Sequence, residues 1–363
     1  MNRNQPISTP GSSKYGNKGK YMDQVFKGLN ISEKAKAALS EAGDYSLAKS
    51  TWGTYNTAAR MLAECARQTQ RSMSLPLSQE DTLEFIGWLL SERKVKSGTI
   101  NSYLAGIRQL HIMRGMEPPH LKSTLVKFIL RGGINRDNIE RRREVKRLPI
   151  TINMMKILKG AVKSWTGTTE DKLLMWTICT TAFHGGFRIH EILCKSEKEF
   201  DPDFTLMTED VKLIGKSMDD FQGQALQIKL KCPKENKTGQ ATIVELYETQ
   251  GNLCPVKAFR KWTRIAKTIE GQPLFRKEDG TPVTGARLNK WLKERLGRMT
   301  SNGNGKFTSH SFRIGLASSM AAGGVGDKEI KEAGRWSSNA YELYMRLPQV
   351  RRAKAAKAIT KLE

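Results

Sequence analysis

The stretch TSHSFRIGLASSMAAGG, residues 308–324, is the part of the sequence on which the fold and the chemistry most depend. His310 and Arg313 are three residues apart, so a helix would present both side chains on one face. The residues after Arg313 are mostly small. An Ala-rich helix with a satisfied polar patch is the ordinary interpretation of such a stretch, so the pair gains meaning only beside other residues.

A second segment, AFHGGFRIHEIL at residues 182–193, places Arg188 on a helix that is expected to begin after a pair of glycines. An arginine flanked by phenylalanine and isoleucine is costly to bury unless it has an anionic partner. Glu191, three residues later, is the nearest candidate. The segment therefore predicts either a structural ion pair or an arginine held ready for an anionic ligand.

A third segment, GRWSSNAYELYMR at residues 334–346, contains Trp336, Tyr341 and Tyr344. Two tyrosines at i and i+3 share a helix face and usually pack as half-buried rings. A phenol of this pair could instead act as a nucleophile. The segment alone does not decide between these interpretations.

The charge balance of the chain is unusual. Among its 363 residues, 61 Lys and Arg stand against 36 Asp and Glu, which gives a formal net charge of +25. Such an excess attracts polyanions, with nucleic acid as the first candidate and an anionic membrane as the second. No stretch is apolar enough to span a bilayer, and the first 20 residues lack the apolar region of a signal peptide. We therefore expect neither a membrane-spanning segment nor a signal peptide.

The sequence contains no metal-ligand cluster and no phosphate-binding Gly-x4-Gly-Lys loop, so we expect no cofactor, neither a metal ion nor ATP. Five scattered cysteines without CxxC spacing suit a reducing compartment.

Hydrophobic spacing divides the chain into parts. Residues 1–20 read as a disordered basic tail, and the pattern from 21 to 135 is helical, with Ser78 as a predicted N-cap. A basic linker is predicted at 136–150, with the option of crossing a DNA backbone. Helices then surround two strands at about 225–231 and 241–247, joined by a polar turn. The predicted fold class is mainly α with a small antiparallel sheet.

The three segments occur in a telling order: Arg188 in G-x-R-x-x-E-[IL], His310 and Arg313 in H-S-x-R, then Gly-Arg-Trp, then a tyrosine followed by Met-Arg. This order, with a hairpin between, resembles the tyrosine recombinases of the phage-integrase type over residues 150–348. The amino-acid sequences of the last two segments look most like those of recombinases of eukaryotic mobile elements of the Crypton and DIRS kind.

The resemblance implies an organisation. It makes 21–135 a helical DNA core-binding domain, 151–348 a mixed α+β catalytic domain, and 349–363 a helical tail that could dock on another subunit. The implied partner is double-stranded DNA, bound by a homo-tetramer that is a monomer or dimer free in solution. The implied location is the nucleus for a eukaryotic protein and the cytoplasm otherwise.

The resemblance also implies residue roles. The family's nucleophile lies about nine residues after its His/Trp position; Tyr344 is eight after Trp336 and Tyr341 only five, which favours Tyr344. A lysine on the hairpin serves as general acid, and of Lys229, Lys231, Lys234 and Lys237 the turn favours Lys234, with Lys237 as competitor.

The remaining roles concern the phosphate. Arg188 and Arg313 would clamp its non-bridging oxygens, and His310 would bond the phosphate or take the phenolic proton. Trp336 would donate its indole N–H, and Glu191 would support Arg188.

The implied activity is site-specific DNA recombination or integration through a 3′-phosphotyrosyl intermediate and a Holliday junction, without metal or ATP. One alternative is a type IB topoisomerase, which shares the chemistry but reseals the same strand. Another is a domesticated DNA-binding protein that no longer cuts.

Overall fold

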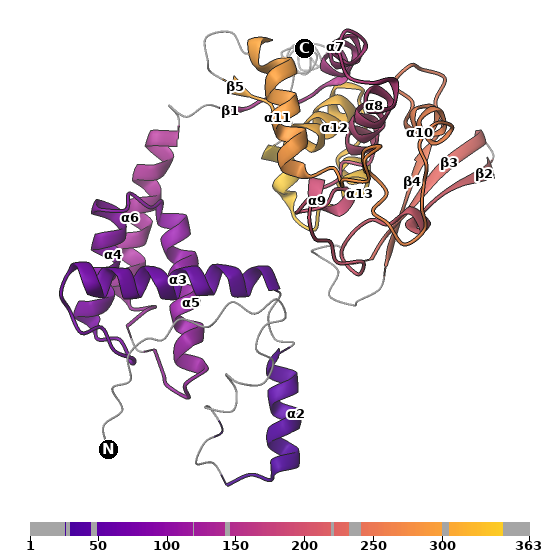
Figure 1. Ribbon diagram of the computed structural model, residues 1–363. Helices are drawn as coiled ribbons and strands as arrows, with labels where there is room; N and C mark the ends of the chain where they lie inside the picture. The colour runs from indigo at the N-terminus through magenta and orange to yellow at the C-terminus, as the bar shows by residue number, and fades with distance from the viewer. Residues whose placement is uncertain are drawn as a thin grey trace, which may run out of the picture. The chain divides into compact units, whose positions relative to one another are not determined.

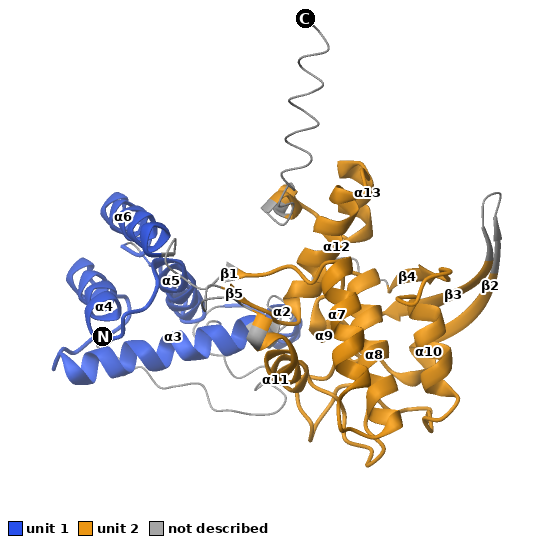
Figure 2. Ribbon diagram, turned by 90° about the horizontal axis from the view of Figure 1, so that it is seen from above, with its two compact units in different colours: residues 1–144 blue, residues 145–363 orange. Residues whose placement is uncertain are grey.

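The computed structural model of this chain forms two compact units, unit 1 at residues 1–144 and unit 2 at residues 145–363 (Figure 2). The predicted basic tail (1–20), the turn of the hairpin and the C-terminal segment (349–363) lie outside the described residues. The residues that the structure describes are 26, 30–44, 49–118, 120–141, 146–218, 221–231, 241–299 and 305–343.

The described residues of unit 1 form helices, as the hydrophobic spacing predicts. The predicted N-cap is present: the Ser78 hydroxyl accepts a hydrogen bond from the Asp81 backbone N–H at 3.0 Å. The helices, shown in Figure 1, are α2 (Glu33–Asp44), α3 (Lys49–Gln68), α4 (Gln79–Ser91), α5 (Ser97–Ile112) and α6 (Thr124–Arg141).

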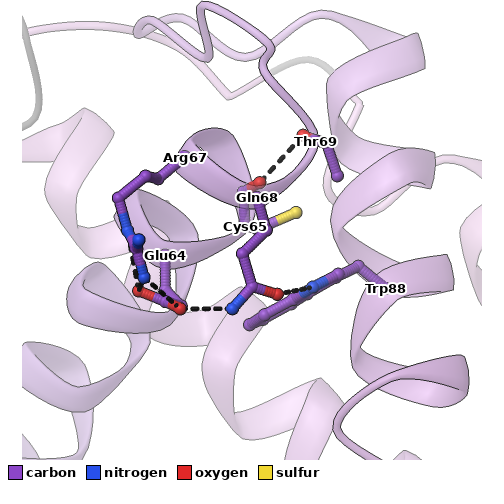
Figure 3. A network of polar contacts seen from close by, with 6 residues as sticks. All are labelled: Glu64, Cys65, Arg67, Gln68, Thr69 and Trp88. Carbon is purple, nitrogen blue, oxygen red and sulfur yellow. Dashed lines mark hydrogen bonds and ion pairs between the residues drawn. The ribbon is translucent and has the colours of Figure 1, made fainter.

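Unit 1 is held together where α3 meets its neighbours. A Cβ on Gly106 of α5 would come within 3.0 Å of the Tyr55 Cα, so the glycine permits the close approach of α3 and α5. A polar network links α3 to α4 (Figure 3): the Trp88 indole N–H donates to the Gln68 side-chain oxygen at 3.0 Å, and the Gln68 amide donates to Glu64.

Helix α6 continues to Arg141, so the first part of the segment that the sequence analysis treats as an aperiodic linker is helical. The side chains there are largely exposed, which explains why no apolar stripe signals the helix. The chain divides into its two units between residues 144 and 145, within the rest of that segment.

Unit 2 is built around α8, in which every residue from Leu174 to Phe183 is buried. A helix that is buried all round lies inside a core. It packs against α7, α10 and α12. The helices are α7 (Ile152–Lys163), α8 (Thr169–His184), α9 (Ile189–Ile192), α10 (Pro255–Thr263), α11 (Gly285–Leu296), α12 (His310–Ala322) and α13 (Asp327–Ala333), with 3₁₀ turns at Thr208–Asp210, Gly297–Met299 and Asn339–Leu343.

The main sheet of unit 2 is antiparallel with the order β2–β3–β4. The two predicted strands are present as β3 (Phe221–Leu230) and β4 (Thr242–Tyr247). The third, β2 (Val211–Met218), pairs with β3 from Val211↔Ile228 to Met218↔Phe221 and was missed from the sequence, although Val211 and Leu213 alternate with lysine. The predicted fold class, mainly α with a small antiparallel sheet, is confirmed.

A second, two-stranded parallel pair ties the connection between the units to α12. Strand β1 (Lys146–Arg147) pairs with β5 (Gly305–Lys306), in the register Arg147↔Lys306. The backbone hydrogen bonds continue beyond the strand pair, because the Ile150 N–H donates to the Ser311 carbonyl at 2.9 Å. The chain entering unit 2 therefore runs alongside the start of α12.

No helix among the described residues combines the length and the apolar character needed to cross a membrane.

Candidate active site

The turn Gly185–Gly186, which ends α8, is the centre of the site. Gly186 has φ +51°, and a Cβ there would come within 2.7 Å of the Leu316 side chain, so glycine suits both the backbone and the space. The carbonyl of Gly185 accepts a hydrogen bond from Arg335 at 2.9 Å, and that of Gly186 accepts one from Arg313. One tight turn thus holds two arginines from distant parts of the chain.

Arg188 lies directly after this turn, as the N-cap of α9 and not inside a helix as predicted from the sequence. The local partner expected at i+3 is present. Glu191 Oε1 accepts a hydrogen bond from Arg188 Nη1 at 3.1 Å, and Glu191 Oε2 accepts from the Arg188 backbone N–H at 2.9 Å. Glu191 is only 9% exposed and Arg188 27%, so the carboxylate is inside and the guanidinium near the surface.

Helix α12 begins at His310 and carries His310 and Arg313 one turn apart, as the sequence predicts. The turn before it is fixed because Asn289 accepts a hydrogen bond from the Ser309 N–H at 2.7 Å. Arg313 is 2% exposed, and its guanidinium carbon lies 4.4 Å from the centre of the Trp336 ring. Stacking on an indole and bonding to Gly186 stabilise a charge that burial alone would disfavour.

His310 is neutral in this environment. Burial and then the positive charges of Arg147, Arg313 and Arg188 lower the pKa of His310 to about 4. A neutral imidazole has one ring nitrogen that can accept a hydrogen bond, and the lowered pKa makes His310 a weaker base than a free imidazole. Of these three cations, Arg147 is one that the sequence analysis did not name, because it sits on β1 within a generally basic run.

Arg335 is the second residue of the site that the sequence analysis left without a role, although it lies inside the Gly-Arg-Trp segment. Its Nη2 is 2.9 Å from Glu191 Oε2, and its guanidinium carbon lies 4.8 Å from the centre of the Phe187 ring. Glu191 is therefore shared by Arg188 and Arg335.

The two tyrosines are separated by the limit of the described residues. Tyr341 is 5% exposed and packs against Trp336 with ring centroids 6.1 Å apart. Burial and the carboxylates of Asp327 and Glu342 raise the pKa of Tyr341, which disfavours its phenolate. Tyr344, the candidate nucleophile, lies outside the described residues.

The candidate general acids on the hairpin, Lys234 and Lys237, also lie outside the described residues. Two other hairpin lysines are described. Lys231 is engaged, with its Nζ 2.7 Å from Asp210 and 3.0 Å from the Pro202 carbonyl oxygen, while Lys229 is exposed. The Asp210 pair gives Lys231 a structural role.

The arrangement concentrates positive charge. Arg188, Arg313 and Arg335 bring three positive charges against the one negative charge of Glu191, which leaves a net charge of +2 at a neutral histidine and an indole. Such an excess suits an anion, and guanidinium forks suit the oxygens of a phosphate. Within the described ranges, no three His, Cys, Asp or Glu side chains gather into a group that could hold a metal ion.

No family model matches the sequence, and no curated protein sequence matches it. Solved structures do match the fold. The XerH site-specific recombinase bound to palindromic difH substrate has a TM-score of 0.57 and 15% identity, over 94% of this chain and 90% of that chain. The Tn1549 transposon integrase in complex with transposon right-end DNA has a TM-score of 0.53 and 14% identity, over 89% and 98%.

A lambda integrase dimer bound to a COC′ core site has a TM-score of 0.51 and 14% identity, over 90% of this chain and 76% of that chain. These comparisons establish the fold of the chain. The helices and the three-stranded antiparallel sheet of unit 2 match the catalytic-domain fold of tyrosine recombinases.

Proposed function

We propose that this chain is a site-specific DNA recombinase or integrase that cuts DNA through a 3′-phosphotyrosyl bond and exchanges strands through a Holliday junction. The observation that carries the proposal is the gathering of Arg188, Arg313 and Arg335 beside the neutral His310, on a fold shared with DNA-bound recombinases. Two of these arginines, Arg188 and Arg335, share the single carboxylate of Glu191. A site with this excess charge is suited to a phosphodiester.

In the proposed reaction the Tyr344 oxygen attacks phosphorus and the bond from phosphorus to the 5′ oxygen breaks. Arg188 and Arg313 stabilise the charge on the non-bridging oxygens, and His310 either bonds the phosphate or takes the phenolic proton. Lys234, with Lys237 as the competitor, gives a proton to the leaving 5′ oxygen. That proton matters because an alkoxide is far more basic than a phenolate, whose parent phenol has a pKa of about 10.

The energy of the broken bond is kept in the phosphotyrosine ester, so the proposed reaction needs neither a metal ion nor ATP. A 5′ hydroxyl from another strand attacks the ester and releases the tyrosine. We further propose that the protein acts as a homo-tetramer on DNA, with residues 349–363 docking on a neighbouring subunit. Unit 1 holds the DNA core site in this proposal. A eukaryotic chain of the Crypton or DIRS kind would work in the nucleus.

The test is covalent trapping. Wild-type protein is incubated with a pool of duplexes of randomised sequence, and DNA that stays attached to protein in detergent is recovered and sequenced. We expect adducts with the wild type and none with Tyr344→Phe, which should still bind DNA. Tyr341→Phe is the matched control, because it removes the other phenolic hydroxyl, and it should form adducts.

An adduct that persists in Tyr344→Phe would contradict the nucleophile. A wild type that binds DNA but forms no adduct would favour the non-cleaving alternative. Joining of strands from two distinct recovered duplexes would separate a recombinase from a topoisomerase, which only reseals the strand that it cuts.

A further inference from the structure

The backbone at Arg335 is unusual for an arginine. Helix α13 ends in two reverse hydrogen bonds, from the Arg335 N–H to the Glu332 carbonyl at 2.9 Å and from the Trp336 N–H to the Lys331 carbonyl at 3.0 Å. In this kind of helix end the residue after the C-cap is left-handed and is usually glycine. Arg335 occupies that position with φ +53°. A residue with a Cβ is disfavoured there, so Arg335 occupies the position at a cost in backbone strain that glycine would avoid.

The side chain of Arg335 has defined contacts in three directions. Nη2 is 2.9 Å from Glu191 Oε2, Nη1 donates to the Gly185 carbonyl at 2.9 Å, and the guanidinium stacks on Phe187. The side chain is only 18% exposed. A long flexible side chain held in this way is part of the interior and not of the solvated surface.

The contact with Glu191 links Arg335 to the phosphate clamp. Glu191 Oε2 accepts from both Arg335 and the Arg188 backbone N–H, while Oε1 accepts from the Arg188 guanidinium. Arg335 therefore fixes the rotation of the carboxylate that orients Arg188. Without Arg335, Glu191 would lose one of the two guanidinium groups that hold its carboxylate.

We propose that Arg335 is a positioning residue for the phosphate clamp: it orients Arg188 through Glu191 and ties the end of α13, and with it Trp336, to the Gly185–Gly186 turn. The proposal rests on the proposed function, because it assigns Arg188 to the scissile phosphate. Arg335 itself is directed at the carboxylate and the carbonyl, so it acts through its neighbours.

The left-handed backbone allows a sharp choice of variants. Arg335→Gly removes the side chain and relieves the backbone, whereas Arg335→Ala removes the side chain and keeps the strain. Gln70→Gly is the matched control, because Gln70 has the same φ of +53° after α3, where the Arg71 N–H donates to the Ala66 carbonyl. It changes the backbone in the same way but lies in unit 1 and carries no charge.

The main measurement is single-turnover cleavage of a duplex recovered by covalent trapping. We expect Arg335→Gly and Arg335→Ala to slow cleavage equally, by about 10- to 100-fold, by analogy with the range for residues that orient the ligands of a metal site. Thermal unfolding should nevertheless show Arg335→Ala to be the less stable of the two. DNA binding and the Gln70→Gly control should stay close to wild type.

Two further readouts identify the route through Arg188. On a duplex with a methylphosphonate at the scissile position the phosphoryl group is uncharged, so the loss in Arg335→Gly should shrink. Without DNA, ¹⁵N NMR of the arginine side chains should show faster rotation of the Arg188 guanidinium in Arg335→Gly than in the wild type.

Wild-type cleavage by Arg335→Gly, or an unchanged Arg188 guanidinium, would overturn the inference. Cleavage losses that follow stability, with Arg335→Gly nearly normal and Arg335→Ala poor, would also overturn it and indicate a merely structural residue. If the wild type forms no adduct with any duplex, the proposed function fails, and the NMR comparison still decides whether Arg335 orients Arg188.

Discussion

Glu191 organises the charges of the site at the scale of single residues. It is one nearly buried carboxylate that two guanidinium groups share, while Arg313 depends on a backbone carbonyl and an indole ring. A buried charge is stable only when it is paired and hydrogen-bonded. Arg188 and Arg335 meet this condition through Glu191, whereas Arg313 is stabilised by the Gly186 carbonyl and the Trp336 ring, and the site keeps an excess of positive charge for an anion.

The protonation of His310 can be tested by pH. Its folded-state pKa of about 4 lies below the ordinary value, so between these two values the unfolded chain binds more protons than the folded one. The contribution of His310 to stability is thus fully present above the ordinary value and falls as the pH drops toward 4. We expect NMR titration to show a neutral His310 ring at pH 6, and Arg147→Gln to raise its pKa.

The protonation of His310 can also be tested by measuring the free energy of unfolding at two pH values. His310→Gln should lose less of its free energy of unfolding than the wild type when the pH is lowered from 7 to 5, because glutamine does not titrate. A His310 ring that titrates at the ordinary value in the wild type would contradict the electrostatic description of the site.

The roles of Arg188, Arg313 and His310 stay predictions that the resemblance to tyrosine recombinases implies. The three residues could be singled out from the sequence because each sits in a short motif with a fixed spacing. Arg335 could not, because its partners Gly185 and Glu191 are about 150 residues away and no local pattern records them. Its left-handed backbone is likewise visible only in the structure.

At the scale of elements, the contact between α12 and the segment that follows β1 positions the helix that carries His310 and Arg313. A Cβ on Gly315 would overlap the carbonyl oxygen of Ile150, so the helix and this segment approach more closely than any other residue would permit. The Ile150 N–H also bonds to the first turn of α12, at Ser311. His310 and Arg313 are carried by this same turn.

Gly315→Ala should therefore destabilise the chain by about 1–3 kcal/mol, the usual cost of overpacking, and slow cleavage by displacing α12. Gly160→Ala is the matched control, because Gly160 is also in a helix of unit 2 and a Cβ there meets nothing within 4 Å. It should stabilise the chain by about 0.5–1 kcal/mol, as alanine does over glycine in a helix. Urea unfolding of both variants measures the difference; equal effects would contradict the close packing.

The helices and the strands β3 and β4 could be predicted because spacing, caps and alternation are local signals. The helical start of the 136–150 segment could not, since α6 ends there in exposed side chains without a stripe. The pair β1–β5 joins residues far apart in the chain and consists of two residues on each side, so it depends on packing and has no signature of its own.

At the scale of the whole molecule, the proposed function predicts that the net charge of +25 governs how the protein binds DNA. Each neutralised phosphate releases counterions, so affinity should fall steeply with salt. With about 6–10 phosphate contacts, the affinity for duplex DNA should fall about 10³- to 10⁵-fold between 50 and 200 mM salt. Fluorescence anisotropy of a labelled duplex measures this slope, and a flat response would contradict binding through the phosphate backbone.

The sequence by itself determined the charge and the helical class with its small sheet, because residue type and short-range spacing are local properties of the chain. The residues that we expect to act on a phosphate stay a prediction from the same local motifs. Only the tertiary structure decided which of those residues meet. The Gly185–Gly186 turn, α12 and the end of α13 come together through packing around Gly186 and Leu316. The sharing of Glu191 by Arg188 and Arg335 follows from that packing, since contacts between distant residues depend on the folded core.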